Sequence, residues 1–307
     1  MSSTLATDDL SDVALRAAAR IRTKRILARV HLWIALGLGL YITVLSVSGS
    51  FIVFRREFNT WFVPRTVAST EGVRLTGDEL QAAVRATYPG DTVVQVTEPR
   101  RPERPVFVAL ERNGVRNERL FDPYAVRDLG ETFPPVLRLM EWAVDLHDNL
   151  LAGDTGRLVN GIGGILFTVL IVTGAWLWWP GRRNVLRSLK VGKPRASRRF
   201  IWQLHSVLGV LTFALLFVWG ITAIYFAFPA PFEGTIDYFD NDLNDLYRPG
   251  EWVILELLKL HFGRFGGLGI RFLWAALGLL PAVLFITGFV LWWTRVVRRR
   301  IAAPAGA

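Results

Sequence analysis

The four histidines are the side chains of this sequence best suited to bind a redox metal. His31, His147, His205 and His261 each lie at one end of a long apolar segment. Ionisable side chains are costly at membrane depth and mark functional sites, whereas a neutral imidazole bound to a metal avoids a buried charge. The sequence has no Cys and only two Met, so a redox metal centre would depend almost entirely on histidine ligands.

Two of the histidines begin copies of one sequence pattern, and the copies align without a gap. In each copy Leu precedes the histidine, Arg follows it by 10 residues, Thr-Gly by 26 and Trp-Trp by 31. This agreement indicates an internal duplication that carries a histidine at a fixed place. The matched residues are His147 and His261, Arg157 and Arg271, Thr173-Gly174 and Thr287-Gly288, and Trp178-Trp179 and Trp292-Trp293.

The composition is typical of a polytopic membrane protein. Hydrophobic residues make up 51% of the 307 residues, and four long stretches contain no Asp, Glu, Lys or Arg. A helix needs about 20 residues to cross a bilayer, and each stretch is long enough. The stretches run at about 31–54, 158–180, 200–232 and 272–294.

The basic residues predict how the chain is oriented in the membrane. Lys and Arg cluster in segments 1–29, 181–199 and 295–307, which the positive-inside rule assigns to the cytoplasm. Segment 229–268 is rich in acidic residues and is expected outside. Both termini are therefore predicted to be cytoplasmic, in a multi-pass protein surrounded by membrane lipid. The net charge of +10 follows from this orientation, so no nucleic-acid partner is expected.

These boundaries predict a mainly α membrane protein with a four-transmembrane-helix bundle. The bundle is built from two parallel helix-pair repeats, and a small α+β periplasmic domain at 55–140 is inserted between helices 1 and 2. Helix 2 is preceded by a periplasmic helix. Transmembrane helices 1, 3 and 4 are predicted at 30–54, 200–228 and 269–294, and segment 141–180 holds the periplasmic helix and helix 2. The cytoplasmic loop 181–199 and the periplasmic loop 229–268 join them.

The inserted domain has its own secondary-structure signals. Thr76-Gly-Asp-Glu79 is a capping-box sequence, which precedes a helical stretch at Leu80–Thr87. Alternating residues and turn signals predict three strands, and a further helix then leads to the membrane. The strands are predicted at Thr92–Thr97, Pro105–Leu110 and about Glu118–Asp122, and the helix at Val136–His147.

The predicted topology sorts the histidines into two pairs at opposite ends of the helices. His31 and His205 are termed the inner pair, and His147 and His261 the outer pair. Two imidazoles from two helices, one on each side of a flat macrocycle, are typical of a b-type haem in a helical bundle. Two such pairs predict two bis-histidine haem b groups that together carry electrons across the membrane.

Arg157 and Arg271 occupy matched positions near the predicted outer end of the bundle. Guanidinium groups pair well with carboxylates, so both arginines are candidate partners of the haem propionates. The same positions also suit arginines that only extend their charge to the membrane surface.

Two other functions stay open on the residues alone. A proton or metal transporter would use the histidines as a relay, although such relays usually include Asp or Glu and the four apolar stretches contain neither. Alternatively, the inserted domain would be a binding or sensor module, with the helices as its membrane anchor.

Several motifs resemble those of a known family. TGDELQAAVRATYPG, VVQVTEP and FDPYAVRDLG resemble a PepSY domain. LHDNLLAG, WQLHSVLG and LHFGRFGG resemble the PepSY-associated transmembrane (PepSY_TM) family of bacterial inner-membrane proteins. Within that family the chain is similar to the FoxB-type ferrisiderophore reductases, which are four-helix proteins with two histidine-bound haems. The resemblance covers about residues 25–300.

The resemblance implies an oxidoreductase that reduces iron(III)–siderophore complexes on the periplasmic side and releases iron(II). His31, His147, His205 and His261 fall on the histidine positions of the family. Some relatives carry a flavin- and NADPH-binding module, but this sequence has no G-x-G-x-x-G in a strand–helix context. The expected electron donor is therefore a quinol, a separate cytoplasmic reductase or a small reductant.

Overall fold

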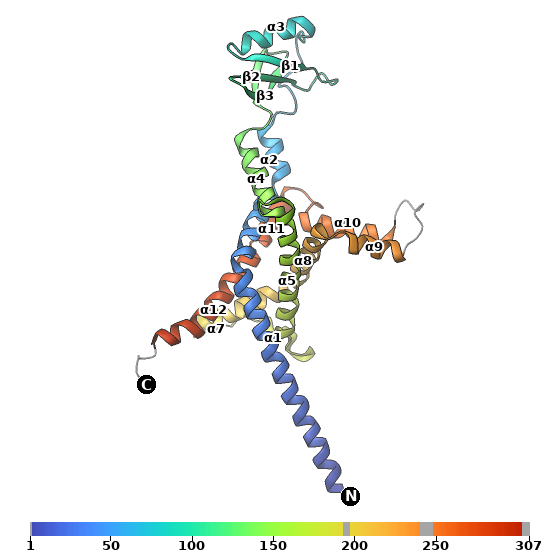
Figure 1. Ribbon diagram of the computed structural model, residues 1–307, viewed down its shortest axis with the longest axis vertical. Helices are drawn as coiled ribbons and strands as arrows, with labels where there is room; N and C mark the ends of the chain where they lie inside the picture. The colour runs from blue at the N-terminus through green and yellow to red at the C-terminus, as the bar shows by residue number, and fades with distance from the viewer. Residues whose placement is uncertain (1, 193–196, 240–247, 303–307) are drawn as a thin grey trace. The chain divides into compact units, whose positions relative to one another are not determined.

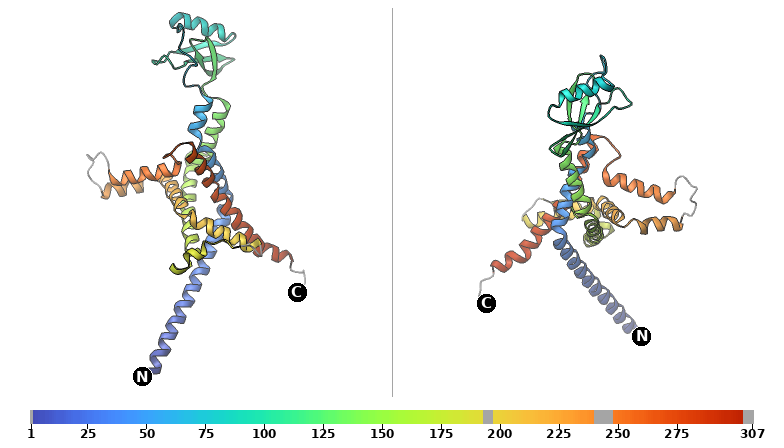
Figure 2. Two further views of the ribbon diagram at one scale, coloured as in Figure 1. Left: turned by 180° about the vertical axis from the view of Figure 1, so that it is seen from behind. Right: turned by 45° about the horizontal axis from the view of Figure 1, so that its top comes forward.

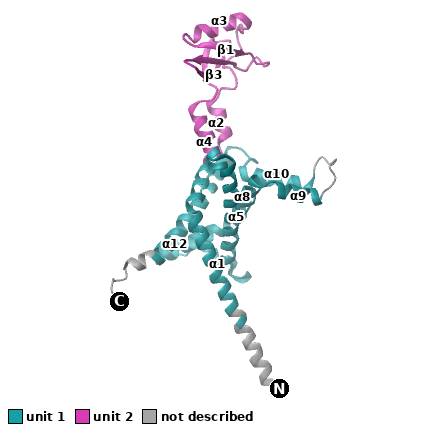
Figure 3. Ribbon diagram, in the orientation of Figure 1, with its two compact units in different colours: residues 1–50, 145–307 teal, residues 51–144 magenta. Residues whose placement is uncertain are grey.

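A computed structural model describes residues 2–192, 197–239 and 248–302. The chain divides into two compact units, coloured separately in Figure 3. Unit 1 comprises residues 1–50 and 145–307, and unit 2 comprises residues 51–144. Parts of the predicted loops 181–199 and 229–268, and the end of the predicted tail 295–307, lie outside the described residues.

Unit 1 holds the membrane-length helices (Figure 1). Among the described residues, three helical segments are long and apolar enough to cross a bilayer, and a bent helix pair makes a fourth if it counts as one span. The first helix begins well before the predicted residue 30. The segments are α1 (Ser2–Ile52), α5 (Gly153–Trp178), α11 (Leu268–Gly278) with α12 (Leu280–Ala302), and the bent pair α7 (Ser197–Leu211) with α8 (Phe213–Ala227).

The third predicted span is bent by 63° between α7 and α8. The bend lies at Thr212, whose hydroxyl donates to the carbonyl oxygen of Leu208 at 2.8 Å. A threonine that bonds back to the preceding turn in this way commonly bends a helix. The helix predicted at 200–228 therefore forms as two helices, α7 and α8, and Gly209 lies within one turn of the bend.

The fourth span is divided between α11 and α12 by a side chain from α1. The Ser46 hydroxyl donates to the carbonyl oxygen of Gly278 at 2.5 Å and accepts from the backbone N–H of Ala282 at 3.3 Å. These two backbone groups are four residues apart and would otherwise bond to each other within one helix. Pro281 lacks a backbone N–H, which weakens the same turn.

Small residues bring the helices of unit 1 close together. α5 packs along α8, and α7 packs along α12 (Figures 1 and 2). A Cβ placed on Gly220 of α8 would lie 2.4 Å from Oγ1 of Thr168 on α5. A Cβ on Gly161 of α5 would lie 2.5 Å from that of Ala227. Close packing of this kind is the main source of helix association in membranes, because lipid is as apolar as the side chains.

Shorter helices flank the spans. α4 (Pro135–Asn149) confirms the helix predicted at Val136–His147. The predicted loop 229–268 contains two helices, α9 (Ala230–Phe239) and α10 (Pro249–Phe262), which lie side by side (Figures 1 and 2). The predicted loop 181–199 includes the short helices η1 (Arg182–Asn184) and α6 (Val185–Ser188).

Unit 2 contains an antiparallel sheet with strand order β1-β2-β3-β4, all within described residues. Leu80 and Val84 on α3, and Tyr88 directly after it, recur every four residues and pack on alternate residues of β2, so one helix face covers one face of the sheet. Phe121 on β3 completes this core. The elements are α2 (Arg55–Phe62), α3 (Gly77–Thr87), β1 (Thr92–Thr97), β2 (Val106–Arg112), β3 (Val115–Asp122) and β4 (Arg127–Glu131).

The structure confirms the predicted helix and three strands of this domain, and it adds β4, which the sequence interpretation missed. The predicted capping box is wrong. The side chain of Thr76 makes no capping hydrogen bond at the start of α3. Instead, the N–H of Gly77 donates to a carboxylate oxygen of Glu98 at 3.1 Å. The contact between Gly77 and Glu98, which are distant in the sequence, thus takes the place of the predicted capping hydrogen bond from Thr76.

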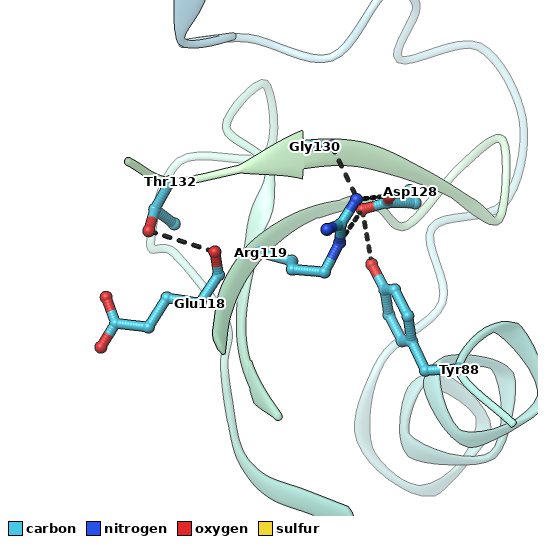
Figure 4. Close-up of polar contacts among 6 residues, drawn as sticks. All are labelled: Tyr88, Glu118, Arg119, Asp128, Gly130 and Thr132. Carbon is cyan, nitrogen blue, oxygen red and sulfur yellow. Dashed lines mark hydrogen bonds and ion pairs between the residues drawn. The ribbon is translucent and has the colours of Figure 1, made fainter. Parts of the chain in front are cut away.

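A cluster around Asp128 joins α3 to the sheet (Figure 4). The Tyr88 hydroxyl donates to Oδ1 of Asp128 at 2.7 Å, and the Arg119 guanidinium forms an ion pair with the same carboxylate. Burial of Asp128 opposes ionisation, but the hydrogen bonds from Arg119 and Tyr88 outweigh it and hold the pKa of Asp128 below its usual value.

Because its pKa is lowered in the folded state, Asp128 stabilises unit 2 above the pKa that it has when unfolded, and this contribution is lost as pH falls through the folded pKa. We expect Asp128→Asn to cost roughly 1–3 kcal/mol at pH 7 and to reduce the loss of stability below about pH 4. Protection of β3 amides against hydrogen exchange in the full chain, corrected for intrinsic rates, measures both effects. Asp78→Asn, on the exposed side of α3, is the control. Identical pH profiles for wild type and Asp128→Asn would contradict the assignment.

Candidate functional site: two histidine pairs

The inner pair brings together two helices that are far apart in the sequence. His31 on α1 and His205 on α7 lie close enough to interact electrostatically. Nδ1 of His31 lies 3.1 Å from Oγ1 of Thr173 on α5, and Nδ1 of His205 lies 2.9 Å from Oγ1 of Thr287 on α12. The Thr-Gly dipeptides of the sequence repeat are therefore the contact points of the inner histidines.

The outer pair follows the same plan. His147 on α4 and His261 on α10 also interact electrostatically. Nδ1 of His147 lies 3.1 Å from Oγ of Ser48 on α1, and Nδ1 of His261 lies 2.5 Å from Oγ1 of Thr222 on α8. The predicted pairing of the four histidines thus agrees with their positions in unit 1.

Ser48 and Thr222 were not identified from the sequence. Ser48 lies 17 residues after His31, and Thr222 lies 17 residues after His205. Aligning these two histidines without a gap would have exposed the match, although little else in the two helices is identical. Seventeen residues of α-helix span about 26 Å, so the inner histidine and the outer hydroxyl of α1 are near opposite ends of one membrane crossing.

The hydroxyls determine which ring nitrogen carries the proton. Each of the four hydroxyls donates its single hydrogen to the backbone carbonyl four residues earlier in its own helix, at 2.7–2.9 Å. A hydroxyl whose hydrogen is engaged can only accept from Nδ1. A second contact of His31 supports a proton on Nδ1. This nitrogen also lies 3.1 Å from the carbonyl oxygen of Leu170, which can only accept a hydrogen bond. From these contacts we infer that Nδ1 carries the proton in each ring, which leaves the lone pair on Nε2.

Small residues next to the hydroxyls leave room for the rings. A Cβ placed on Gly174 would lie 3.0 Å from Cε1 of His31, and one on Gly288 would lie 3.3 Å from Cε1 of His205. Gly49, which follows Ser48, is tighter, since a Cβ there would lie 2.8 Å from Cε1 of His147. At the contact between Thr222 and His261, the small residue after the hydroxyl residue is Ala223.

The helix ends that carry the outer histidines are held by donors at matched repeat positions. Asn160 and Trp274 each lie 13 residues after the histidine of their repeat. Nδ2 of Asn160 donates to the carbonyl oxygens of His147 and Asp148, at 2.7 and 2.8 Å. Nε1 of Trp274 donates to the carbonyl oxygen of Leu260 at 2.7 Å. Two different side chains thus satisfy terminal carbonyl groups that a helix leaves without partners.

The two repeat-matched arginines have different environments. Arg271 on α11 is buried, and Nη1 lies 3.5 Å from the carbonyl oxygen of Phe262, the residue after His261. Arg157 is exposed on the first turns of α5. The structure therefore places Arg271 against the residue that follows an outer histidine, whereas the matched Arg157 is exposed.

The outer histidines are neutral at physiological pH. Burial lowers the pKa of His261 to about 3, with a smaller contribution from the neighbouring His147. Burial also lowers the pKa of His147, against the opposing effect of Asp148. A neutral imidazole is the form that coordinates a metal.

The donor set fits a metal that arrives within a planar macrocycle. No group of three or more His, Cys, Asp or Glu side chains that would hold a bare metal ion occurs among the described residues. Each histidine pair instead offers two neutral Nε2 donors from two helices, and a haem brings its remaining metal ligands itself. The glycines beside the rings let the imidazoles approach their neighbouring helices closely.

The fold and the site define a membrane protein with a small α+β domain and paired histidines on its helices. The family described as PepSY-associated TM region matches residues 28–249 and 240–295, which is nearly the whole chain. The chain therefore belongs to the PepSY_TM family. No match to a curated protein was found.

The glycine contact at the outer pair is testable against a control in the same helix. Gly49→Ala places a methyl group against His147, so we expect the protein to lose about 1–3 kcal/mol of stability. Gly37→Ala meets no atom within 4 Å and should be neutral, or stabilising by up to about 1 kcal/mol through helix propensity. Unfolding of both variants in the same detergent, followed by tryptophan fluorescence, measures the difference. Equal stability of the two variants would show that the ring of His147 is not confined by Gly49.

Proposed function

We propose that this protein is a di-haem b electron-transfer protein that reduces iron(III)–siderophore complexes. In this proposal His31 and His205 are the axial ligands of one haem, and His147 and His261 are those of the other. The protein resides in a bacterial inner membrane with both termini in the cytoplasm, and the two helix-pair repeats form one four-helix bundle. The haem nearer the periplasm delivers the electron to the substrate.

One observation carries the proposal. All four histidines of the chain place Nδ1 within 2.5–3.1 Å of a hydroxyl, an arrangement that favours a proton on Nδ1 and a lone pair on each Nε2, in two pairs. A histidine that only served to stabilise the helices would not require the same tautomer at every site. Membership of the PepSY_TM family supports the membrane setting.

The residues of the chain contribute binding and orientation. The hydroxyls and glycines fix each imidazole, and the buried Arg271 supplies a positive charge near the outer pair, where a haem propionate needs one. The haem supplies the one-electron chemistry when bound.

Reduction would release the metal because siderophores bind iron(III) through hard oxygen donors. A quinol or a separate cytoplasmic reductase gives up an electron, and the iron(III) of the complex becomes iron(II), which such ligands hold less tightly. No group has to be transferred or bond to the protein for this step.

Optical spectra before and after dithionite test the haem assignment. We expect the purified protein to contain two low-spin b-type haems that acid acetone extracts, because no Cys is available to tether them. His31→Ala and His205→Ala should each remove the inner haem, and His147→Ala and His261→Ala should each remove the outer one. Pigment-free protein from haem-replete cells would overturn the proposal. Joint loss of one haem in His31→Ala and His147→Ala would overturn the pairing.

Stopped-flow reoxidation tests the reaction itself. Protein reduced beforehand should be reoxidised by an iron(III)–siderophore complex, with iron(II) captured by a chelator. His261→Ala should abolish this reaction. His205→Ala should preserve reoxidation of an outer haem that is already reduced, but block turnover driven from the cytoplasmic side. Equal reoxidation rates in wild type and His261→Ala would contradict electron transfer to the substrate through the outer haem, even if both haems are present.

A further inference from the structure

The four hydroxyl residues that contact the histidines share more than their side-chain type. In each case the backbone carbonyl that accepts the hydroxyl hydrogen belongs to a valine four residues earlier, and the following residue is Gly or Ala. The four sites therefore have one local sequence, Val-x-x-x-[Ser/Thr]-[Gly/Ala]. The dipeptides are Ser48-Gly49, Thr173-Gly174, Thr222-Ala223 and Thr287-Gly288, and the valines are Val44, Val169, Val218 and Val283.

The contacts form a reciprocal pattern within each repeat. In the first repeat, α5 holds His31 of α1 through Thr173, and α1 holds His147 of α4 through Ser48. In the second repeat, Thr287 of α12 holds His205 and Thr222 of α8 holds His261. Each repeat thus orients its own two histidines without help from the other repeat. Each histidine pair, in contrast, takes one member from each repeat.

We propose that these four [Ser/Thr]-[Gly/Ala] dipeptides are the positioning residues of the two metal sites. The hydroxyl accepts the Nδ1 hydrogen and selects the tautomer that presents Nε2, and the adjacent small residue sets how closely the ring approaches its helix. This inference rests on the proposed haem ligation and deepens it, because it assigns a role to residues that contact the proposed ligands.

The hydroxyl also affects the metal electronically. An acceptor at Nδ1 draws the ring towards imidazolate and raises the basicity of Nε2, so it stabilises the more positive, oxidised metal. Removing the acceptor should therefore raise the midpoint potential of the haem concerned. Outer-sphere partners of this kind typically change metal affinity by about 10–100-fold when they are lost.

Thr287→Val tests the inference at the inner pair, because valine keeps the shape and removes only the hydroxyl. We expect the midpoint potential of the inner haem to rise, haem affinity to fall about 10–100-fold, and the outer haem to keep its potential. Thr287→Ser restores the acceptor and should return both values towards wild type.

Thr294→Val is the matched control. Thr294 lies on the same helix and donates in the same way to Val290, its valine four residues earlier, at 2.8 Å. Its hydroxyl touches no histidine, so its loss should leave both potentials unchanged. A potential in Thr287→Val equal to that of wild type, or an equal shift in Thr294→Val, would overturn the inference. If Thr287→Val does not fold, Thr222→Val makes the test on His261, with the potential of the outer haem as the readout.

Nitrogen-15 chemical shifts of the imidazoles in haem-depleted protein separate this inference from the proposed function. Wild type should show protonated Nδ1. Thr222→Val should shift His261 towards protonated Nε2, because Thr222 is the acceptor at Nδ1 of that ring. Protein that never binds haem but shows these shifts would contradict the proposed function and retain the positioning role. Haem-binding protein with the same His261 tautomer in wild type and Thr222→Val would contradict the positioning role alone.

Discussion

The hydrogen bond from a histidine Nδ1 to a helix hydroxyl is the interaction on which the site depends. An imidazole in an apolar helix bundle needs a partner for its N–H group, since a buried polar group without one costs about 1–3 kcal/mol. Ser48, Thr173, Thr222 and Thr287 provide that partner, and each has already given its own hydrogen to its helix. The direction of the bond is therefore fixed, and so is the nitrogen left for a ligand.

The close packing of helices in unit 1 follows from the need to form these hydrogen bonds between Nδ1 and a hydroxyl. A bond of about 3 Å between two helices requires their backbones to approach closely, and glycine or alanine beside each hydroxyl permits this. Elsewhere polar side chains adjust the helices instead. Ser46 enters the backbone ladder between Gly278 and Ala282, and Thr212 bends the third span. The polar residues of these helices therefore shape the spans as well as hold the rings.

Duplication gives the two halves a common plan but not identical details. The hydroxyl, the small residue and the histidine recur at fixed spacings, because the geometry of the ring contact tolerates little change. The donor that caps the outer histidine helix is Asn160 in one copy and Trp274 in the other, since any N–H donor of suitable reach satisfies a terminal carbonyl. Arg271 is buried whereas Arg157 is exposed, so matched sequence positions do not guarantee matched environments.

The sequence by itself determined the membrane-length segments, the duplication, the α3 helix and three strands of unit 2, and the grouping of the four histidines. These features follow from composition and periodicity, which can be evaluated for each segment of the chain separately. Only the tertiary structure decided that Ser48 and Thr222 contact the outer histidines, that Nε2 carries the lone pair, and that Thr76 does not cap α3. Each depends on the rotation and register of one element against another, and those are set by packing between residues distant in the chain.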